Sequence, residues 1–459
     1  MGKLQSILQH PDEVLPLLQM ALAARRAKQL PKQPSLAFCY DMLNQVSRSF
    51  AIVIQQLPEQ LRDPVCIFYL VLRALDTIED DMAIPQSTKV PLLKVFYEKI
   101  YDRSWKMSCG QGSYVRLMEH YPNVTDVFLG LDMSYQKVIA DITRRMGAGM
   151  AEFIEKDVAT VADYDLYCHY VAGLVGIGLS QLFASSKLES RQFASMENLS
   201  NHMGLFLQKT NIIRDYLEDI MEEPAPRMFW PKEIWGKYGK TLADFKEPGN
   251  KAAAVACLNH MVGDALRHAE HSLAYMSKLH DRQVFRFCAI PQVMAIGTLA
   301  LCWNNHGVFT GVVKMRRGEV AKYMLSLDTM ADLYQAFDHF AAIIAKRCET
   351  MRKPSDPVVK TTLGRVQHVR QLCKEGLAAG PRRPVQSPIS WSSRLALLWV
   401  AVVYFAFTFG YGGYREALLG AAGAQTMPAL DLLQKACATF TLAATIYMAF
   451  LGFKQSLPK

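Results

Sequence analysis

One acidic pattern, Asp-x-x-Glu-Asp, occurs twice in this chain, in DTIEDD at 76–81 and in DYLED at 215–219. In a helix, residues three and four apart lie on the same face, so each segment places three carboxylates side by side. Like charges at this spacing destabilise an isolated helix. A chain that repeats the arrangement therefore predicts two helices whose acidic faces meet a compensating cation.

Carboxylate oxygens of this kind suit Mg²⁺, which keeps several waters and bridges carboxylates to substrate phosphates. The two segments begin 139 residues apart, at 76 and at 215, and a helical bundle can bring such segments face to face around a metal. The alternative is a pair of solvated acidic faces. We favour the metal site, with six candidate ligands: Asp76, Glu79, Asp80, Asp215, Glu218 and Asp219.

Each acidic face continues toward the helix N-terminus as an apolar stripe. Ahead of the first cluster it carries Arg73, Leu72, Tyr69, Phe68 and Val65, and ahead of the second it carries Asn211, Gln208 and Leu207. A stripe that is ionic at one end fits a ligand with a charged head and a long hydrocarbon tail, although Phe68 and Leu72 could be core residues. Arg73 and Arg214 adjoin the acids, where each could form a structural salt bridge or bind a diphosphate oxygen. We favour a mixed role for both.

Long stretches without strand-like alternation predict an all-α body. Their apolar residues recur at three- and four-residue intervals in 38–57, 64–82, 126–156, 164–185, 200–221, 251–280, 284–310 and 329–350. The glycines of GLVGIG, at 173–178, fall inside a helical pattern, which argues against a dinucleotide-binding turn. We predict one large helical catalytic domain over residues 1–373.

The C-terminal segment differs from this body. Residues 395–413 and 436–453 contain no charge, and each is near the minimum length of about 18 residues that crosses a bilayer. The preceding segment, 374–394, is rich in Gly, Pro, Arg and Ser and predicts a linker. We expect a membrane anchor at 395–459, as a hairpin of two spans with both ends in the cytosol. A single span is the alternative.

Charge and cysteine content narrow the classes of function. The net charge is +9 over 459 residues, without long basic runs, which disfavours nucleic-acid binding. None of the ten cysteines lies in a CxxC pair or at zinc-ligand spacing. We therefore expect buried, reduced thiols in a protein that faces the cytosol.

Six segments carry a resemblance to a known family: VSRSFAIVIQQL (46–57), FYLVLRALDTIEDD (68–81), YCHYVAGLVGIGLSQLF (167–183), MGLFLQKTNIIRDYLED (203–219), FWPKEIW (229–235) and FCAIPQVMAIGTL (287–299). Together they span nearly the whole body, which resembles the squalene synthase family. The paired acidic motifs alone indicate the wider class of head-to-head prenyl synthases, which includes phytoene synthase. The AIPQVMAIGTL stretch and the hydrophobic tail point more narrowly to squalene synthases.

The resemblance implies a helical bundle of the isoprenoid synthase type with a central cavity. It implies a Mg²⁺-dependent condensation of two farnesyl diphosphates to presqualene diphosphate, followed by reduction to squalene with NADPH or NADH. It places the protein at the endoplasmic reticulum membrane with the catalytic domain in the cytosol, and we expect a monomer. Two alternatives stay open: a phytoene- or presqualene-diphosphate-type synthase without the reduction, and a tail-anchored helical adaptor whose acids bind nothing.

The resemblance also implies roles for single residues. Tyr167 takes a proton-transfer role, with Tyr170 as its rival, and Asp76, Asp80, Asp215 and Asp219 act in catalysis through the metal. Substrate contacts are implied for Ser47, Arg48, Ser49, Phe50, Val65, Phe68, Tyr69, Arg73, Val171, Val175, Gln208, Asn211, Arg214 and Arg227, and pocket walls for Tyr275, Phe287 and Pro291. Lys314, Arg316 and Arg317 of VVKMRRG are expected to bind the phosphates of the nicotinamide cofactor. A solvated basic turn is the alternative for that stretch.

Overall fold

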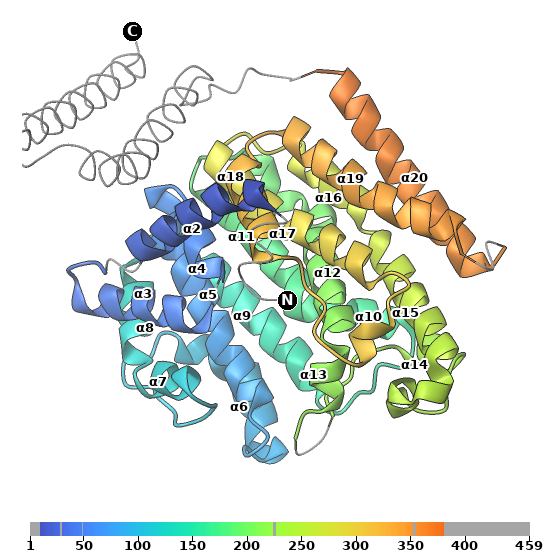
Figure 1. The fold of residues 1–459 in the computed structure, drawn as a ribbon. Helices are drawn as coiled ribbons and strands as arrows, with labels where there is room; N and C mark the ends of the chain where they lie inside the picture. Colours follow the sequence, from blue (N-terminus) through green and yellow to red (C-terminus); the bar gives the residue numbers. More distant parts are fainter. Residues whose placement is uncertain (1–9, 28–29, 48, 224–225, 352–354, 381–459) are drawn as a thin grey trace, which may run out of the picture. The chain divides into compact units, whose positions relative to one another are not determined.

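The computed structural model describes residues 10–27, 30–47, 49–223, 226–351 and 355–380. Within these ranges every regular element is a helix (Figure 1), which confirms the predicted all-α body. The described residues belong to one unit, Met1–Pro381. The predicted membrane spans, 395–413 and 436–453, lie outside the described residues.

The helices of the N-terminal half end near residue 185. They are η1 (Pro11–Glu13), α2 (Val14–Ala27), α3 (Pro34–Val46), α4 (Ser49–Ile54), α5 (Glu59–Asp80), α6 (Gln86–Lys99), α7 (Ser113–Glu119), α8 (Pro122–Gly130), α9 (Met133–Phe153), α10 (Val161–Cys168), the π-helix η2 (His169–Gly173) and α11 (Leu174–Ser185).

The second half begins with a short 3₁₀ turn. Its elements are η3 (Arg191–Ser195), α12 (Glu197–Arg214), α13 (Tyr216–Ile220), α14 (Lys232–Trp235), η4 (Leu242–Lys246), η5 (Pro248–Asn250), α15 (Lys251–Leu266), α16 (Ala269–Met276), α17 (Arg282–Cys302), η6 (His306–Phe309), α18 (Arg317–Ser326), α19 (Met330–Glu349) and α20 (Pro357–Ala378).

The expected helical stretches are present, but several of them are divided. The stretch 126–156 breaks between α8 and α9, where the Asp132 side chain accepts a hydrogen bond from the backbone N–H of Ser134 and so starts the second helix. The stretch 200–221 breaks at Asp215. The α-helices α2, α6, α7, α14, α18 and α20 lie outside the expected stretches. Helix α20 continues to Ala378, so the predicted linker boundary at 374 lies inside a helix.

Glycines allow the central helices α11 and α12 to cross closely. A Cβ on Gly176 would overlap the carbonyl oxygen of Ser200, and a Cβ on Gly204 would overlap that of Ala172. The GLVGIG segment is therefore helical, as expected, and its second glycine serves helix packing rather than a phosphate-binding turn. This contact fixes the position of α12, which carries half of the candidate site.

The core of the described body is apolar and tightly buried. Two helical stretches, Val161–Ser185 and Arg282–Cys302, are long and apolar enough to cross a membrane, but 50% and 78% of their most apolar windows are buried within the protein. They are therefore core elements of this bundle. All nine described cysteines are buried and form no disulfide, in agreement with the expected reduced thiols.

Candidate active site

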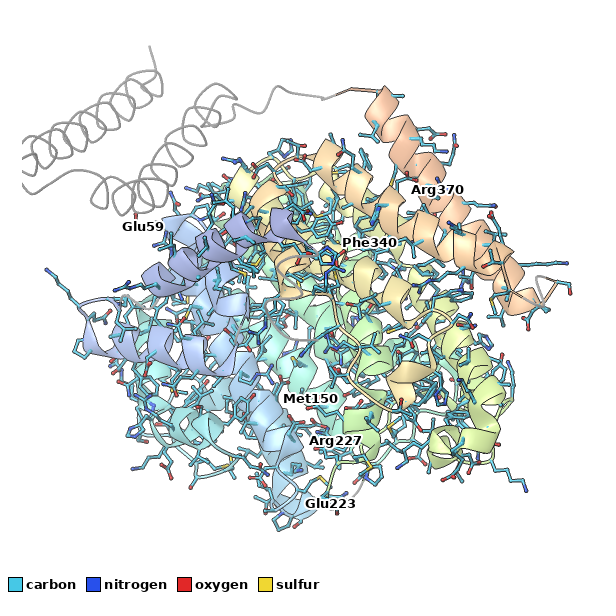
Figure 2. The ribbon with its side chains drawn as sticks, in the orientation of Figure 1. Glu59, Met150, Glu223, Arg227, Phe340 and Arg370 are labelled. Atoms are coloured by element: carbon cyan, nitrogen blue, oxygen red, sulfur yellow. The ribbon has the colours of Figure 1, made fainter. Side chains whose placement is uncertain are left out.

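The two acidic segments lie close together, and Arg227 connects them. Its backbone N–H donates to the carbonyl oxygen of Asp219, 3.1 Å away. Its guanidinium donates to Glu79, with a distance of 2.6 Å between Nη2 and Oε1, and also to Asp80. Figure 2 labels Arg227 beside Glu223 at the lower end of the bundle. Residues that are 139 positions apart in the sequence thus share one site, as the repeated motif predicts.

The first acidic cluster occupies the last turn of α5, which ends at Asp80. The C-terminus of a helix carries partial negative charge from its unpaired carbonyls, so three carboxylates there face repulsion from one another and from the helix itself. This placement strengthens the argument for a compensating cation.

The second cluster differs from the expected continuous helix. Helix α12 ends at Arg214, and Asp215 has a non-helical ψ of 11° before the short helix α13. The backbone N–H of Asp219 still donates to the carbonyl oxygen of Asp215 at 2.9 Å. The one-turn spacing between these two acids is therefore kept, although the helix is interrupted.

Arginines balance several of the acids. Arg73 lies 3.3 Å from Asp76, and Arg214 binds both carboxylate oxygens of Asp215 at 2.7 and 2.5 Å. The salt-bridge part of the mixed role that we expected for Arg73 and Arg214 is present. The Nε of Arg73 is buried without a hydrogen-bond partner, so this guanidinium has a spare donor.

Burial makes the charged form of some of these acids costly. It raises the pKa of Asp76 to about 7 against the opposing effect of Arg73, and it raises the pKa of Asp219 to about 7 with help from Asp215. Burial also raises the pKa of Glu79, and Arg227 opposes that shift. Carboxylates in this state gain free energy from a further cation, since it favours their ionised form.

These residues fit a hard divalent cation by their chemistry, because carboxylates from two segments converge on one cavity. In the described chain no three His, Cys, Asp or Glu side chains are yet arranged to hold a metal ion. The reason is visible in the contacts: Glu79, Asp80 and Asp215 are turned toward arginines.

A cavity of about 190 Å³ lies between the two clusters. Its wall is formed by Asp80, Tyr167, Gln208, Asn211, Ile212, Asp215, Asp219, Glu222, Arg227 and Phe229. The structure therefore brings Tyr167, Gln208, Asn211 and Arg227 together with three of the acids. Glu222 and Phe229 were not among the expected site residues. The aromatic residue before Trp230 in FWPKEIW was the available signal for Phe229.

The ring of Tyr167 is fixed by aromatic neighbours. It stacks on Phe229 with 4.0 Å between ring centroids and meets Phe153 edge-on at 5.4 Å. Burial raises the pKa of Tyr167 well above its usual value, and the charge of Glu79 adds to the shift. The hydroxyl therefore stays protonated at physiological pH and can donate a hydrogen bond into the cavity.

Tyr170 is placed differently from Tyr167. Its hydroxyl donates to Glu152 at 3.2 Å, and its ring packs where Gly149 lacks a side chain. The π-helix that carries Tyr170 inserts an extra residue per turn and turns this ring away from the cavity. The geometry thus favours Tyr167 over its rival.

The predicted apolar stripe lies in the interior of the bundle. Val65 and Phe68 are 2% exposed, and the ring of Phe68 fills the space beside Gly178. Val171 and Val175, one turn apart on the next helical segment, are only half-buried. None of these four residues lines the cavity between the two acidic clusters.

The SRSF segment lies beside the first acidic helix. The hydroxyl of Tyr69 donates to the carbonyl oxygen of Val46 at 3.3 Å, and the Arg73 guanidinium lies 5.6 Å from the centre of the Tyr69 ring. Ser47 is buried and caps α3 by donating to Leu43, so its hydroxyl is already engaged. Phe50 is exposed. Arg48 and the side chain of Ser49 lie outside what the structure describes.

The three expected pocket walls fall in different surroundings. Tyr275 is buried and its hydroxyl lies 2.7 Å from that of Ser180, so it belongs to a polar contact between helices and does not line the cavity described above. Phe287 borders a second hollow, of about 280 Å³. Pro291 is half-buried within α17, where it leaves the carbonyl of Phe287 without its helical partner.

The basic stretch lies away from the acid-lined cavity. Arg316 pairs with Glu13 at 2.8 Å, and Met315 packs against Gly297 of α17. Lys314 and Arg317 are exposed, and no ion pair is found for either within the described ranges. Only these two cations of the expected cofactor set are therefore free to meet a ligand.

Comparison with known proteins gives a consistent result. The family model for squalene/phytoene synthase matches residues 43–319. Squalene synthase LSS from Botryococcus braunii is 56% identical over 458 residues, covering 98% of this chain and 99% of that protein. Squalene synthase 1 from Panax ginseng is 53% identical, covering 90% and 98%.

Other similar proteins extend this result. Lycopaoctaene synthase from Botryococcus braunii is 51% identical, covering 96% of this chain and all of that protein. Among solved structures, a complex of TcSQS with the ligand E5700 superimposes with a TM-score of 0.72 at 48% identity, covering 74% of this chain and 99% of that one.

Proposed function

Because the chain belongs to the squalene/phytoene synthase family, we propose that it is a squalene synthase. In this proposal it condenses two farnesyl diphosphates head to head to presqualene diphosphate and reduces that intermediate to squalene with NADPH or NADH. One observation carries the assignment to this chain: Arg227 joins the two acidic clusters around a cavity that also contains Tyr167.

The acidic end of the cavity receives the diphosphates. Bound Mg²⁺ would supply positive charge to the leaving diphosphate oxygens, held by Asp76, Glu79, Asp80, Asp215 and Asp219, with Glu218 at the exposed edge. When these carboxylates turn to metal, the arginines that now bind them become available. Arg73, Arg214 and Arg227 then orient the diphosphates by charge-assisted hydrogen bonds.

Tyr167 controls the proton at the reacting centre. Its raised pKa keeps the hydroxyl neutral, so its oxygen takes a proton from the substrate carbon as its own proton passes to a leaving diphosphate oxygen, which is the base. Phe229 and Phe153 hold the ring in place, and their faces also exclude water. Exclusion of water matters, since water would quench a developing carbocation.

The apolar interior accepts the two farnesyl chains. In this proposal the chains lie along Val65 and Phe68 of α5, Val171 of η2 and Val175 of α11, with Phe287 as a further wall. The length of prenyl chain that the enzyme accepts would depend on how much space the interior offers before large side chains block it.

The exposed cations Lys314 and Arg317 serve the reduction step. NADPH would supply the hydride, and Lys314 and Arg317 would bind its phosphates, while Arg316 maintains the fold of the segment through Glu13. The anchor at 395–459, with one or two spans, would hold the enzyme at the endoplasmic reticulum membrane with this domain in the cytosol. We expect the enzyme to act as a monomer.

Product analysis tests the function. The purified full chain in detergent is incubated with Mg²⁺ and farnesyl diphosphate, with and without NADPH. We expect presqualene diphosphate without the reductant and squalene with it. Geranylgeranyl diphosphate is supplied in competition, because a relative of similar identity is named for another hydrocarbon, lycopaoctaene.

Three other results would change the proposal. Presqualene diphosphate that persists with NADPH would make the protein a synthase without the reduction. Preference for the longer substrate would change the substrate class. If neither farnesyl nor geranylgeranyl diphosphate gives a product, the alternative of a helical adaptor without enzymatic activity would be favoured.

A further inference from the structure

Helix α2 presents a row of leucines to solvent. Leu15, Leu18 and Leu22 are 54%, 59% and 57% exposed, and their spacing of three and four residues places them on one face. No other described helix exposes more than one large apolar side chain. An exposed apolar face of this kind marks a site of interaction with a partner or a membrane.

Ion pairs hold this helix with its leucines outward. Glu13 is 5% exposed and accepts hydrogen bonds from Arg316, and Asp12 pairs with Lys322 of α18. The absence of a side chain at Gly318 makes room for the Glu13 carboxylate. The inner face of α2 adds Met20, which packs on the core. The outward leucine face is thus a fixed feature of the fold.

The surface around α2 has more apolar and cationic groups. Leu325 on α18 and Phe50 on α4 are both exposed, and both helices pack against α2. Beside them, the hollow of about 280 Å³ contains Arg62, Arg282 and Arg286. The one carboxylate found to pair with these arginines in the described chain is Asp328. Apolar groups bordered by excess positive charge match the interface of an anionic membrane.

This surface lies opposite the acidic site. Helix α5 runs from Glu59 to Asp80 and carries the acids in its last turn. Figure 2 labels Glu59 at the upper left of the bundle and Arg227 in its lower part. Helices α2 and α18 lie at the upper edge in Figure 1, as does the end of α20. Arg62 belongs to the first turn of α5, so its arginine cluster shares the upper end.

We propose that the outer face of α2, with Leu15, Leu18 and Leu22, inserts into the surface of a lipid bilayer while the neighbouring arginines meet anionic headgroups. The choice of a bilayer rests in part on the anchor included in the proposed function. Only 16 residues, 379–394, separate the end of α20 from the first uncharged stretch at 395–413. Insertion of this face holds the body with its acidic end toward the cytosol.

Photo-cross-linking of the full chain tests this contact. Benzoylphenylalanine replaces Leu18, or Met221 at the acidic end as a similarly exposed control at 60%, or Tyr404 inside the first predicted span. Each protein is reconstituted in vesicles of phosphatidylcholine with phosphatidylserine and illuminated, and the tryptic peptides are weighed. We expect phospholipid adducts at 18 to exceed those at 221 by at least about tenfold, as for a helix at the membrane interface.

A second arm tests the arginines. Adducts at 18 should fall when phosphatidylserine is omitted, and Arg282→Gln should lessen the dependence on phosphatidylserine. Equal adduct frequency at 18 and 221, or cross-links from 18 to a second copy or to another part of the chain, would overturn the proposal. Adducts at 404 report on the anchor and squalene formation reports on the function, so a failure of either is distinguishable from a failure at 18.

Discussion

At the scale of single residues, the site places competing positive charges around a few carboxylates. Arg73, Arg214 and Arg227 each bind an acid that we assign to the metal. Such an arrangement lets the acids stay close before substrate arrives and supplies ready diphosphate ligands afterwards. Single substitutions can therefore separate residues that act on the substrate from those that only surround it.

Replacement of Asp76 or Asp219 by Asn should abolish condensation while the helical fold is retained. Loss of a metal-bound interaction in the transition state costs several orders of magnitude, about 10³-fold or more. The rate of diphosphate release with farnesyl diphosphate and Mg²⁺ measures it. Glu223→Gln is the matched control, an exposed acid beside the cavity that should leave the rate unchanged. Turnover near normal in Asp76→Asn would remove the metal assignment.

Replacement of Tyr167 by Phe keeps the stacking on Phe229 but removes the hydroxyl. We expect presqualene diphosphate formation to slow by about 10²- to 10⁴-fold, the range for loss of a proton-transfer group. Tyr170→Phe loses only the hydrogen bond to Glu152 and should stay within about threefold of the native rate. The opposite ranking of the two variants would transfer the role to Tyr170.

At the scale of helices, close crossing and segment anchoring decide how the site is assembled. The α11–α12 contact depends on small residues. Helix α2 follows directly on η1, whose Glu13 and Asp12 pair with Arg316 of the basic segment and with Lys322 of α18. Neither α11 nor α2 carries an acid of the site. The contact between α11 and α12 is still needed to position the residues of the site, and α2 helps to keep the cofactor segment in place.

Gly204→Ala should damage both stability and activity, because its Cβ would overlap the carbonyl oxygen of Ala172. The backbone must move, at a cost of about 1–3 kcal/mol, and α12 moves Gln208 and Asn211 with it. Thermal unfolding and turnover measure the two effects. Gly364→Ala in α20, where nothing lies within 4 Å, should be neutral or stabilise the protein by up to about 1 kcal/mol. A fully stable and active Gly204→Ala would show that the crossing tolerates separation.

Lys314→Ala combined with Arg317→Ala should slow the reduction about tenfold or more and let presqualene diphosphate accumulate, because phosphate contacts to a nucleotide are lost. Condensation should be unchanged. Arg316→Ala should differ: loss of the ion pair with Glu13 should lower the midpoint of thermal unfolding as well. Both half-reactions are followed by product analysis. An equal decrease of the two steps in the double variant would exclude a specific cofactor role.

At the scale of the whole molecule, packing between distant helices adds groups whose protonation opposes folding. His202 of α12, His271 of α16 and His268, which directly precedes α16, meet in a hollow also bordered by Asp165, Arg267 and Glu270. The Nδ1 atoms of His202 and His268 are 2.7 Å apart, and the ring of His202 stacks on that of His271 at 3.8 Å. Two imidazoles that share one hydrogen bond cannot both be protonated.

Acid should therefore destabilise the body. Burial, followed by the charges of His271 and Arg267, lowers the pKa of His202 to about 4. The unfolded chain binds this proton near pH 6.5, so stability is lost as pH falls from about 6.5 to about 4. His202→Asn should reduce the loss between about pH 7 and pH 5 by about 1 kcal/mol, allowing for its partial exposure. Thermal unfolding at both pH values measures this, with exposed His339→Asn as the control; identical pH sensitivity in His202→Asn and the native protein would contradict it.

Much of this protein follows from local sequence pattern. The apolar spacing of three and four predicts the helices, since each needs one buried face, and the repeated acids predict a shared cationic site. Helix ends were harder to predict. The breaks at Asp132 and Asp215 depend on a capping side chain and on a change of backbone angle, and neither interrupts the apolar pattern. Helix α2 has an exposed apolar face, so its pattern does not resemble that of an ordinary surface helix.

The sequence by itself determined the helical class, the acids that must meet a cation, and the family to which the chain is similar. These depend on residue type and on spacing within a single helix. Only the tertiary structure decided which arginine holds which acid, that Tyr167 lines the cavity while Tyr170 does not, that Arg316 is committed to Glu13, and which face of α2 is left to solvent. Those outcomes depend on contacts between residues far apart in the chain, and the local sequence pattern does not predict such contacts.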